Sequence, residues 1–252
     1  MELINEPAVL TAVAPAGHRD RLLTFFTRGQ GGVRLYARRP SARGAATMFL
    51  EPLQGGELVF VRTREGDRGR MHSFVPQRVW PGIRAELGRT VQALAFLELL
   101  NGMLAEGEPH AETFELLVGF LNRLEQERRP GLARIVASLR LVTVAGFAPH
   151  LESCTVCLRA TGAAAGLLFS PEAGGIVCRE CRSQTHLGTL PISPGALGYL
   201  RRVLSLSEGQ ARRLRIAPAV EREVSRLLDA FVEARTDVRP RCASALERLE
   251  AV

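Results

Sequence analysis

Four cysteines occur in two closely spaced pairs, and their spacing is the clearest chemical signal in the sequence. The first pair is Cys154 and Cys157, and twenty residues later the second pair is Cys178 and Cys181. Two residues between paired cysteines let one tight turn present both sulfurs to an ion, and two such turns complete a tetrahedron. Because four thiolates would fill every ligand position, we expect one structural Zn²⁺ rather than a catalytic one.

The segment between the two cysteine pairs predicts a small hairpin. Residues 166–170 and 174–177 are short runs on either side of Pro-Glu-Ala, which would bring the second pair opposite the first. A redox role for the Cys-x-x-Cys pairs would need a thioredoxin-like context, which is missing. His186 could replace one sulfur ligand, but a surface imidazole is the simpler interpretation. The fifth cysteine, Cys242, is expected to be a small buried or half-buried thiol.

A strand near the amino terminus places arginines and a tyrosine on one face. Alternation over residues 33–38 directs Arg34, Tyr36 and Arg38 to the same side. Guanidinium groups bind phosphate and an aromatic ring stacks on a base, so this face suits single-stranded nucleic acid. No acid lies anywhere in residues 28–43. The predicted DNA-binding residues are Arg34, Tyr36, Arg38, Arg39, Arg43, Arg62 and Arg64.

The composition favours a polyanionic partner. The formal net charge is +7, and all 33 basic residues are arginine. Within residues 1–80, 12 arginines stand against 7 acids. The absence of lysine excludes P-loop, Schiff-base and kinase-type lysine chemistry. The alternative is that the arginine face is an ordinary solvated surface on a structural adaptor, in which case binding would not respond to salt.

The secondary structure that must position these residues is predicted to change from strands to helices after residue 80. Strands are predicted over residues 8–13, 21–27, 33–38, 58–63 and 70–75. Five strands in so short a stretch fit a closed barrel such as an OB-fold. Trp80-Pro81-Gly82 marks a boundary. Beyond it, apolar residues recur at helical spacing over residues 83–104, 114–124, 135–142, 197–204 and 220–231.

The predicted fold class is therefore multidomain α+β, with an amino-terminal OB-fold barrel followed by an all-α domain that carries a four-cysteine zinc module. The predicted domains are the DNA-binding barrel at 1–80, a first helical part at 81–150, the zinc module at 151–190 and a second helical part at 191–252. No apolar run reaches membrane-spanning length, and the first residues lack the features of a secretory signal. We expect a reduced, cytoplasmic location.

An ordered series of segments resembles a known family. Its members are residues 17–27 (GHRDRLLTFFT), 32–38 (GVRLYAR), 50–53 (LEPL), 97–100 (LELL), 107–109 (GEP), 141–149 (LVTVAGFAP), 154–157 (CTVC), 169–178 (FSPEAGGIVC) and 190–194 (LPISP). No single segment is decisive, but their order and spacing are specific. Over nearly the whole chain this series resembles the RecO family of recombination mediators.

The resemblance implies an OB-fold, a helical domain with a zinc module, and no catalytic activity. It implies binding of single- and double-stranded DNA, annealing of complementary strands, and association with the nucleoid. The implied partners are RecR and the C-terminal tail of single-stranded-DNA-binding protein, so that RecA can load at gaps. The family's basic third-strand positions fall on Arg34 and Arg38. Its zinc cysteines, which only part of the family has, fall on Cys154, Cys157, Cys178 and Cys181. A glycine commonly follows the second basic position, whereas Arg39-Pro40 stands here.

The last expectations concern a binding site for the tail of single-stranded-DNA-binding protein and the alternative functions of the chain. The acidic, hydrophobic tail would bind the helical module, with Arg134 and Arg140 as candidate contacts; the alternative is that both are ordinary exposed helix charges. A zinc-ribbon RNA-binding or transcription-associated factor could use the same basic barrel. A hydrolase lacks support, because no G-x-S-x-G or H-E-x-x-H motif is present. Neither a membrane nor a small-molecule substrate is expected.

Overall fold

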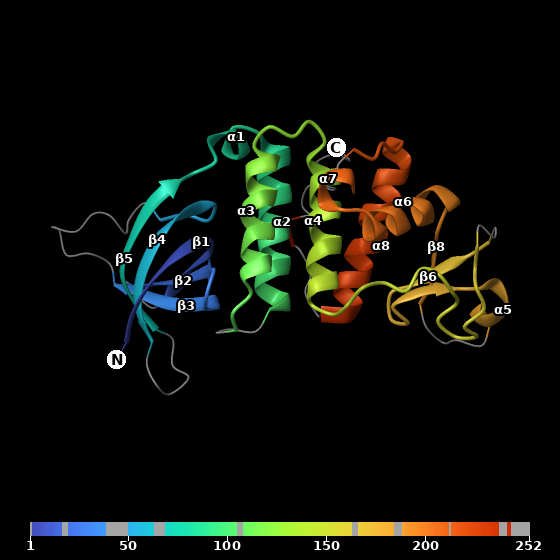
Figure 1. Cartoon of the computed structure of the whole chain (residues 1–252), viewed down its shortest axis with the longest axis horizontal. Helices are drawn as coiled ribbons and strands as arrows, with labels where there is room; N and C mark the ends of the chain where they lie inside the picture. Colours follow the sequence, from blue (N-terminus) through green and yellow to red (C-terminus); the bar gives the residue numbers. More distant parts are fainter. Residues whose placement is uncertain are drawn as a thin grey trace.

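A computed structural model of the chain describes residues 2–16, 20–38, 50–62, 69–104, 108–162, 166–183, 188–211, 213–236 and 241–242. The chain forms a strand-rich unit at one end, helices in the middle and a small sheet at the other end (Figure 1). None of the helices within these residues combines the length and apolarity needed to cross a bilayer.

The first five strands form a closed barrel in the order β1-β2-β3-β5-β4. Their bounds are β1 (Glu2–Ala16), β2 (Asp20–Thr27), β3 (Gly31–Arg38), β4 (Gln54–Arg62) and β5 (Gly69–Arg78). Neighbouring strands are antiparallel except β3 and β5, which are parallel. Strand β1 is much longer than the predicted residues 8–13, because its polar first half also pairs with β4 and a register shift after Leu10 lets it continue along β2.

Inward side chains of the strands fill the barrel. Leu23, Leu35 and Phe60 are fully buried, and the rings of Phe25 and Phe74 lie 5.0 Å apart. In β3 the predicted alternation is present, since the side chains on either side of Arg34 and Tyr36 turn into this core. The barrel therefore holds the opposite face of β3 toward solvent.

Trp80 joins the barrel to the helices. Its side chain is 2% exposed, its backbone is left-handed at φ 43°, and its indole N–H donates to Asn122 Oδ1 at 2.8 Å. Barrel residues Val9, Phe26 and Leu53 pack in the same apolar cluster as the helices. One end of the barrel is thus closed by helical side chains, which fixes the barrel on the helical unit.

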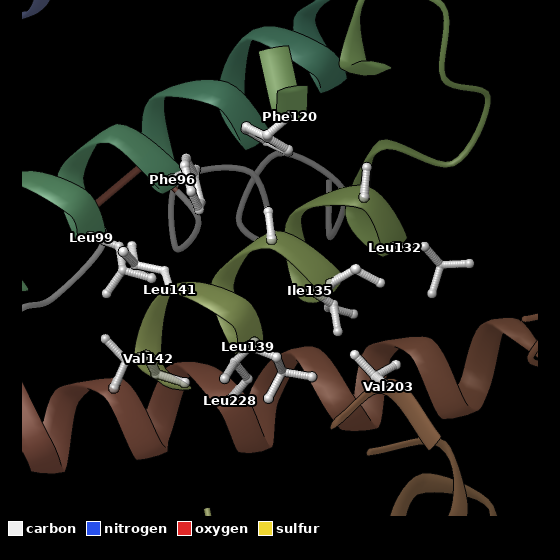
Figure 2. Packing of buried hydrophobic residues seen from close by; sticks show 14 of the residues in the cluster. Phe96, Leu99, Phe120, Leu132, Ile135, Leu139, Leu141, Val142, Val203 and Leu228 are labelled. Atoms are coloured by element: carbon white, nitrogen blue, oxygen red, sulfur yellow. The ribbon is translucent and has the colours of Figure 1, made fainter. Parts of the chain in front are cut away.

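Helix α4 lies at the centre of the helical unit. The helices are α1 (Pro81–Arg84), α2 (Leu87–Met103), α3 (Ala111–Leu124), α4 (Pro130–Val144), α6 (Pro194–Ser205), α7 (Glu208–Ala211) and α8 (Pro218–Thr236). Ten of the fifteen residues of α4 are buried. Figure 2 shows Leu139 of α4 near Leu228 of α8, with Phe96 on the other side. The five predicted helical stretches are all helical, although the first is divided between α1 and α2. Among the described residues, the four-residue helices α7 and α5 (Arg179–Arg182) were not predicted.

A small three-stranded sheet follows α4 in the chain. Its strands are β6 (Leu168–Ser170), β7 (Gly175–Val177) and β8 (Leu190–Pro191), in the order β7-β6-β8, and helix α5 (Arg179–Arg182) follows β7. The predicted hairpin corresponds to β6 and β7. Phe169 packs 6.0 Å from the ring of Phe231 of α8, and Leu151 and Ile176 join the same core. The sheet is therefore attached to the helices by apolar contacts.

Candidate functional site

The structure brings the four paired cysteines together. One ligand atom from each lies within 4.8 Å of the others, and the sulfurs of Cys157 and Cys178 are 3.9 Å apart. Cys154 and Cys181 are buried, whereas Cys157 and Cys178 are half-buried. These four residues, the cysteine cluster, are arranged so that they can hold one metal ion.

Two tight turns build the cysteine cluster. In the first, Leu158 has a left-handed φ of 62° and its N–H donates to the carbonyl of Cys154 at 2.9 Å. In the second, the N–H of Cys181 donates to the carbonyl of Cys178 at 3.1 Å, at the start of α5. The N–H of Thr155 donates to the carbonyl of Ile176 in β7 at 2.8 Å, so the sheet sets the distance between the turns.

The electrostatics of the cysteine cluster favour a cation. Burial raises the pKa of Cys154, but N–H donors from Cys157, Cys178 and Val156 outweigh it, and the pKa falls to about 6. The pKa of Cys181 rises to about 12, because its thiol is hydrogen-bonded to Cys178 and because it is buried beside other sulfurs. The thiol of Cys154 thus loses its proton readily, whereas the thiol of Cys181 resists ionisation. A bound cation removes that resistance by neutralising the negative charge.

Arg201 of α6 anchors the segment that carries the first cysteine pair. Its guanidinium donates to the carbonyl of Leu151 at 2.6 Å, to the carbonyl of Gly162 at 2.8 Å and to the Thr161 hydroxyl at 3.1 Å. Sequence reasoning missed this residue, because its acceptors are mainly backbone carbonyls, which no motif records. Arg201 positions the cysteine cluster relative to the helices.

The outer face of the barrel presents part of the predicted DNA-binding set. Arg34 is exposed and Tyr36 is 37% exposed, on the same side of β3. Arg38 ends β3 opposite Asp20, and its side chain lies outside the described part. The parallel pairing of β3 with β5 places Arg70, which is exposed, directly beside Tyr36. We call Arg34, Tyr36 and Arg70 the barrel face.

The remaining predicted DNA-binding residues are not placed on this face by the structure. Arg39, Arg43 and Arg64 lie outside the described residues. Arg62 is the last residue of β4 and pairs with Glu2 of β1, but its side chain is not among those described. Their predicted role in DNA binding stays a prediction.

The structure corrects the expectation for Arg134. Its side chain is only 4% exposed and is held by Gln92 Oε1 at 2.6 Å, Asp229 Oδ1 at 2.8 Å and Ser225 Oγ at 2.6 Å. It joins α4 to α2 and α8, so it is neither a surface contact for a partner nor an exposed helix charge. The expectation was wrong because sequence spacing cannot show which neighbouring helix covers a side chain.

Arg140 is also engaged inside the helical unit. Its guanidinium donates to the carbonyl of Val203 at 2.9 Å and to that of Leu206. These carbonyls belong to the last turn of α6 and the residue after it, so Arg140 satisfies acceptors that the helix end leaves open. Arg140 is half-buried, so it is not an ordinary exposed helix charge, and its role as a contact for an acidic tail stays a prediction.

Cys242 is separate from the cysteine cluster. It is half-buried, as expected, and its thiol donates to Glu98 Oε1 of α2 at 3.3 Å. Burial and this hydrogen bond raise its pKa to about 11. The thiol is therefore almost fully protonated at neutral pH, and a protonated thiol is a poor nucleophile and metal ligand.

The barrel, the central helices and the cysteine cluster define a class of protein in which a strand-rich amino-terminal unit precedes a helical unit with a four-cysteine site. A family model described as "Recombination protein O C terminal" matches residues 84–241. The chain belongs to the RecO family.

Similar proteins named "DNA repair protein RecO" support this membership. That of Desulfitobacterium hafniense is 31% identical, over 99% of this chain and 91% of the relative. That of Rubrobacter xylanophilus is 32% identical, over 84% of each. That of an Anaeromyxobacter species is 32% identical, over 86% of this chain and 85% of the relative. The similarity thus extends beyond the helical unit into the barrel.

Proposed function

We propose that this chain is a non-catalytic DNA-binding mediator of recombinational repair. It binds single- and double-stranded DNA, anneals complementary strands and, with RecR and single-stranded-DNA-binding protein, assists RecA loading. The observation that carries the proposal is the barrel face, where two arginines flank an exposed tyrosine. The names of the relatives support a role in DNA repair.

The barrel supports a nucleic-acid site of the OB-fold type. Its five strands close in the order β1-β2-β3-β5-β4, and OB-folds are five-stranded barrels that bind oligonucleotides over strands 2 and 3. Arg34 and Tyr36 lie on β3 within that region. We therefore assign the barrel to the OB-fold and the DNA strand to this face.

Binding follows from the chemistry of the barrel face. Arg34 and Arg70 neutralise backbone phosphates and release counterions, while the ring of Tyr36 stacks on a base. Stacking tolerates any base, so the site does not select a sequence. Strands whose phosphates are neutralised repel one another less, and complementary strands then pair without an energy source.

The double substitution Arg34→Glu/Arg70→Glu tests the barrel face. Replacing two cations by anions is expected to weaken binding of a single-stranded oligonucleotide at least about tenfold and to abolish annealing. Fluorescence anisotropy at several salt concentrations measures binding, and circular dichroism verifies folding. Arg128→Glu/Arg179→Glu makes the same charge change at exposed positions elsewhere and should bind normally. Undiminished binding by the barrel variant would exclude this face.

The cysteine cluster fits Zn²⁺, which we propose it binds. Tetrahedral zinc with Zn–S bonds of about 2.3 Å requires sulfurs roughly 3.8 Å apart. The separation of Cys157 and Cys178, 3.9 Å, agrees. When bound, zinc supplies a cross-link between the two turns. With four protein ligands the site has no open position for a substrate, which supports a structural role.

A hollow in the helical unit suits the tail of single-stranded-DNA-binding protein. It is lined by apolar Leu132, Val136 and Leu214, with Glu127 and the arginines Arg123, Arg129 and Arg215 around them. Arg123 pairs with Glu208 and Arg129 pairs with Glu221, whereas Arg215 is exposed at the rim. An acidic, apolar peptide would place its apolar side chain in the hollow and a carboxylate near Arg215. This location replaces the buried Arg134 as the proposed contact.

The tail hypothesis predicts a selective effect of Arg215→Glu. A fluorescent acidic peptide that ends in apolar residues should bind this variant at least about tenfold more weakly, because an anion now faces its carboxylates. Arg213→Glu is the matched control, since Arg213 is also exposed but does not line the hollow. Equal affinity for both variants would exclude the hollow as the tail site.

A further inference from the structure

Strand β5 contains an inserted residue opposite β4. Val59 of β4 pairs with Ser73, and the next residue of β4, Phe60, pairs with Met71. His72 lies between these two pairs and has no partner of its own in β4. Two residues of one strand opposite one of its neighbour form a β-bulge, which changes the direction in which nearby side chains point.

The bulge turns His72 outward while Phe74 fills the barrel. In a regular strand, residues 72 and 74 would lie on the same side. Phe74 is instead only 8% exposed, with its ring 5.0 Å from that of Phe25, whereas His72 is exposed. The bulge therefore brings both Arg70 and His72 to the outer side of β5, and bulges often redirect a side chain beside a functional site.

His72 lies next to the barrel face. Arg70 precedes it by two residues on β5, and the parallel pairing of β3 with β5 sets Tyr36 beside Arg70. Both strands run in the same direction, so the end of β3 at Arg38 lies on the His72 side of that pair. Among the described residues, none holds the His72 ring by a hydrogen bond or an ion pair. A ligand that lies along the barrel face can therefore reach the ring.

The charged groups around His72 favour an anion. Arg70 is exposed on the same side of β5, and residues two apart in a strand are separated by about 7 Å, so one segment of a bound strand can contact both. The residues of β4 opposite the bulge are apolar, and the acid of that strand, Glu57, pairs beyond the bulge. Asp20 of β2 is separated from His72 by β3.

Histidine gains or loses its charge between about pH 5 and 8, whereas arginine stays charged. All 33 basic residues of the chain are arginine, so the other cations of the barrel face keep their charge across that range. We propose that His72 is a further phosphate-binding group of the barrel face, and that its protonated ring makes the affinity for DNA fall as the pH rises. This inference rests on the proposed function of the barrel face and adds a response to pH.

Binding of oligo-dT at two pH values tests the role of His72. Thymine and phosphodiester groups keep their charge across this range, and the protein samples are verified to have the same zinc content at both pH values. The intact chain should bind at least about threefold more tightly at about pH 6 than at about pH 8, because one added phosphate contact contributes up to about fivefold near 0.1 M salt. His72→Gln should bind weakly at both pH values, whereas His72→Arg should bind tightly at both. Fluorescence anisotropy measures the affinity, and circular dichroism verifies folding.

Further variants separate the possible failures. His110→Gln removes a different histidine, at the start of α3, and should keep the full pH response. If the intact chain binds equally at both pH values, or if His72→Gln keeps the response, the role of His72 is excluded while the barrel proposal stands. If His72→Gln and His72→Arg are equally weak at both pH values, His72 maintains the shape of β5 and the inference is overturned. If Arg34→Glu/Arg70→Glu binds as tightly as the intact chain, the barrel proposal itself fails.

Discussion

Replacing Arg134 with alanine is expected to lower the free energy of unfolding by about 3–5 kcal/mol. The guanidinium is 4% exposed and contacts α2 through Gln92 and α8 through Ser225 and Asp229. Removing it leaves the carboxylate of Asp229 without its cation and the amide oxygen of Gln92 without its donor. Urea unfolding followed by circular dichroism measures the change in stability. Arg226→Ala, on the exposed side of α8, should change stability by no more than about 0.5 kcal/mol.

A second variant distinguishes the cost of an unpaired charge from the loss of packing. Arg134→Met/Asp229→Leu removes both charges and restores apolar volume, so it should recover most of the stability that Arg134→Ala loses. If the double variant is as unstable as the single one, hydrogen bonding by Arg134, rather than neutralisation of Asp229, holds the three helices together. A decrease below about 1 kcal/mol in the single variant would contradict the buried network itself.

Substituting Cys154 with serine is expected to release the metal and unfold the small sheet. Structural zinc sites contribute about 10–16 kcal/mol of apparent binding free energy at neutral pH, more than a small segment can replace. Cys154 is fully buried, and two backbone N–H groups donate to its sulfur, each at 3.4 Å. Because Phe169 and Ile176 of the sheet pack in the helical core, the helices should also lose stability.

Metal analysis and the single tryptophan locate the damage in the Cys154→Ser variant. The intact chain should contain one zinc per molecule and the variant none, whereas Cys242→Ser should keep its zinc because Cys242 lies outside the cluster. Trp80, which donates to Asn122 of α3 and packs in the helical core, should keep its fluorescence in the folded variant but change it at a lower urea concentration than in the intact chain. Zinc retained at one per chain by Cys154→Ser would contradict the assigned ligands.

Local patterns predicted the elements on which the candidate sites stand. The Cys-x-x-Cys pairs required two turns, and the structure forms both. Alternation in residues 33–38 correctly separated Arg34 and Tyr36 from the buried side chains. Helical spacing located the five longer helices. These features depend on backbone geometry over a few residues, which explains why they can be recognised without a structure.

Only the tertiary structure determined which neighbouring element, if any, covers each face of a helix or strand. Arg134 and Arg226 both belong to helices with an apolar stripe, yet one is buried among three helices and the other is exposed. Arg70 lies beside Tyr36 because β3 and β5, more than thirty residues apart, pair in parallel. The sequence by itself therefore determined which side chains share a turn or a face. The packing of distant elements determined which charges are neutralised inside the molecule and which remain at its surface. Sequence patterns could not show this, because contacts between distant elements produce no periodic pattern along the chain.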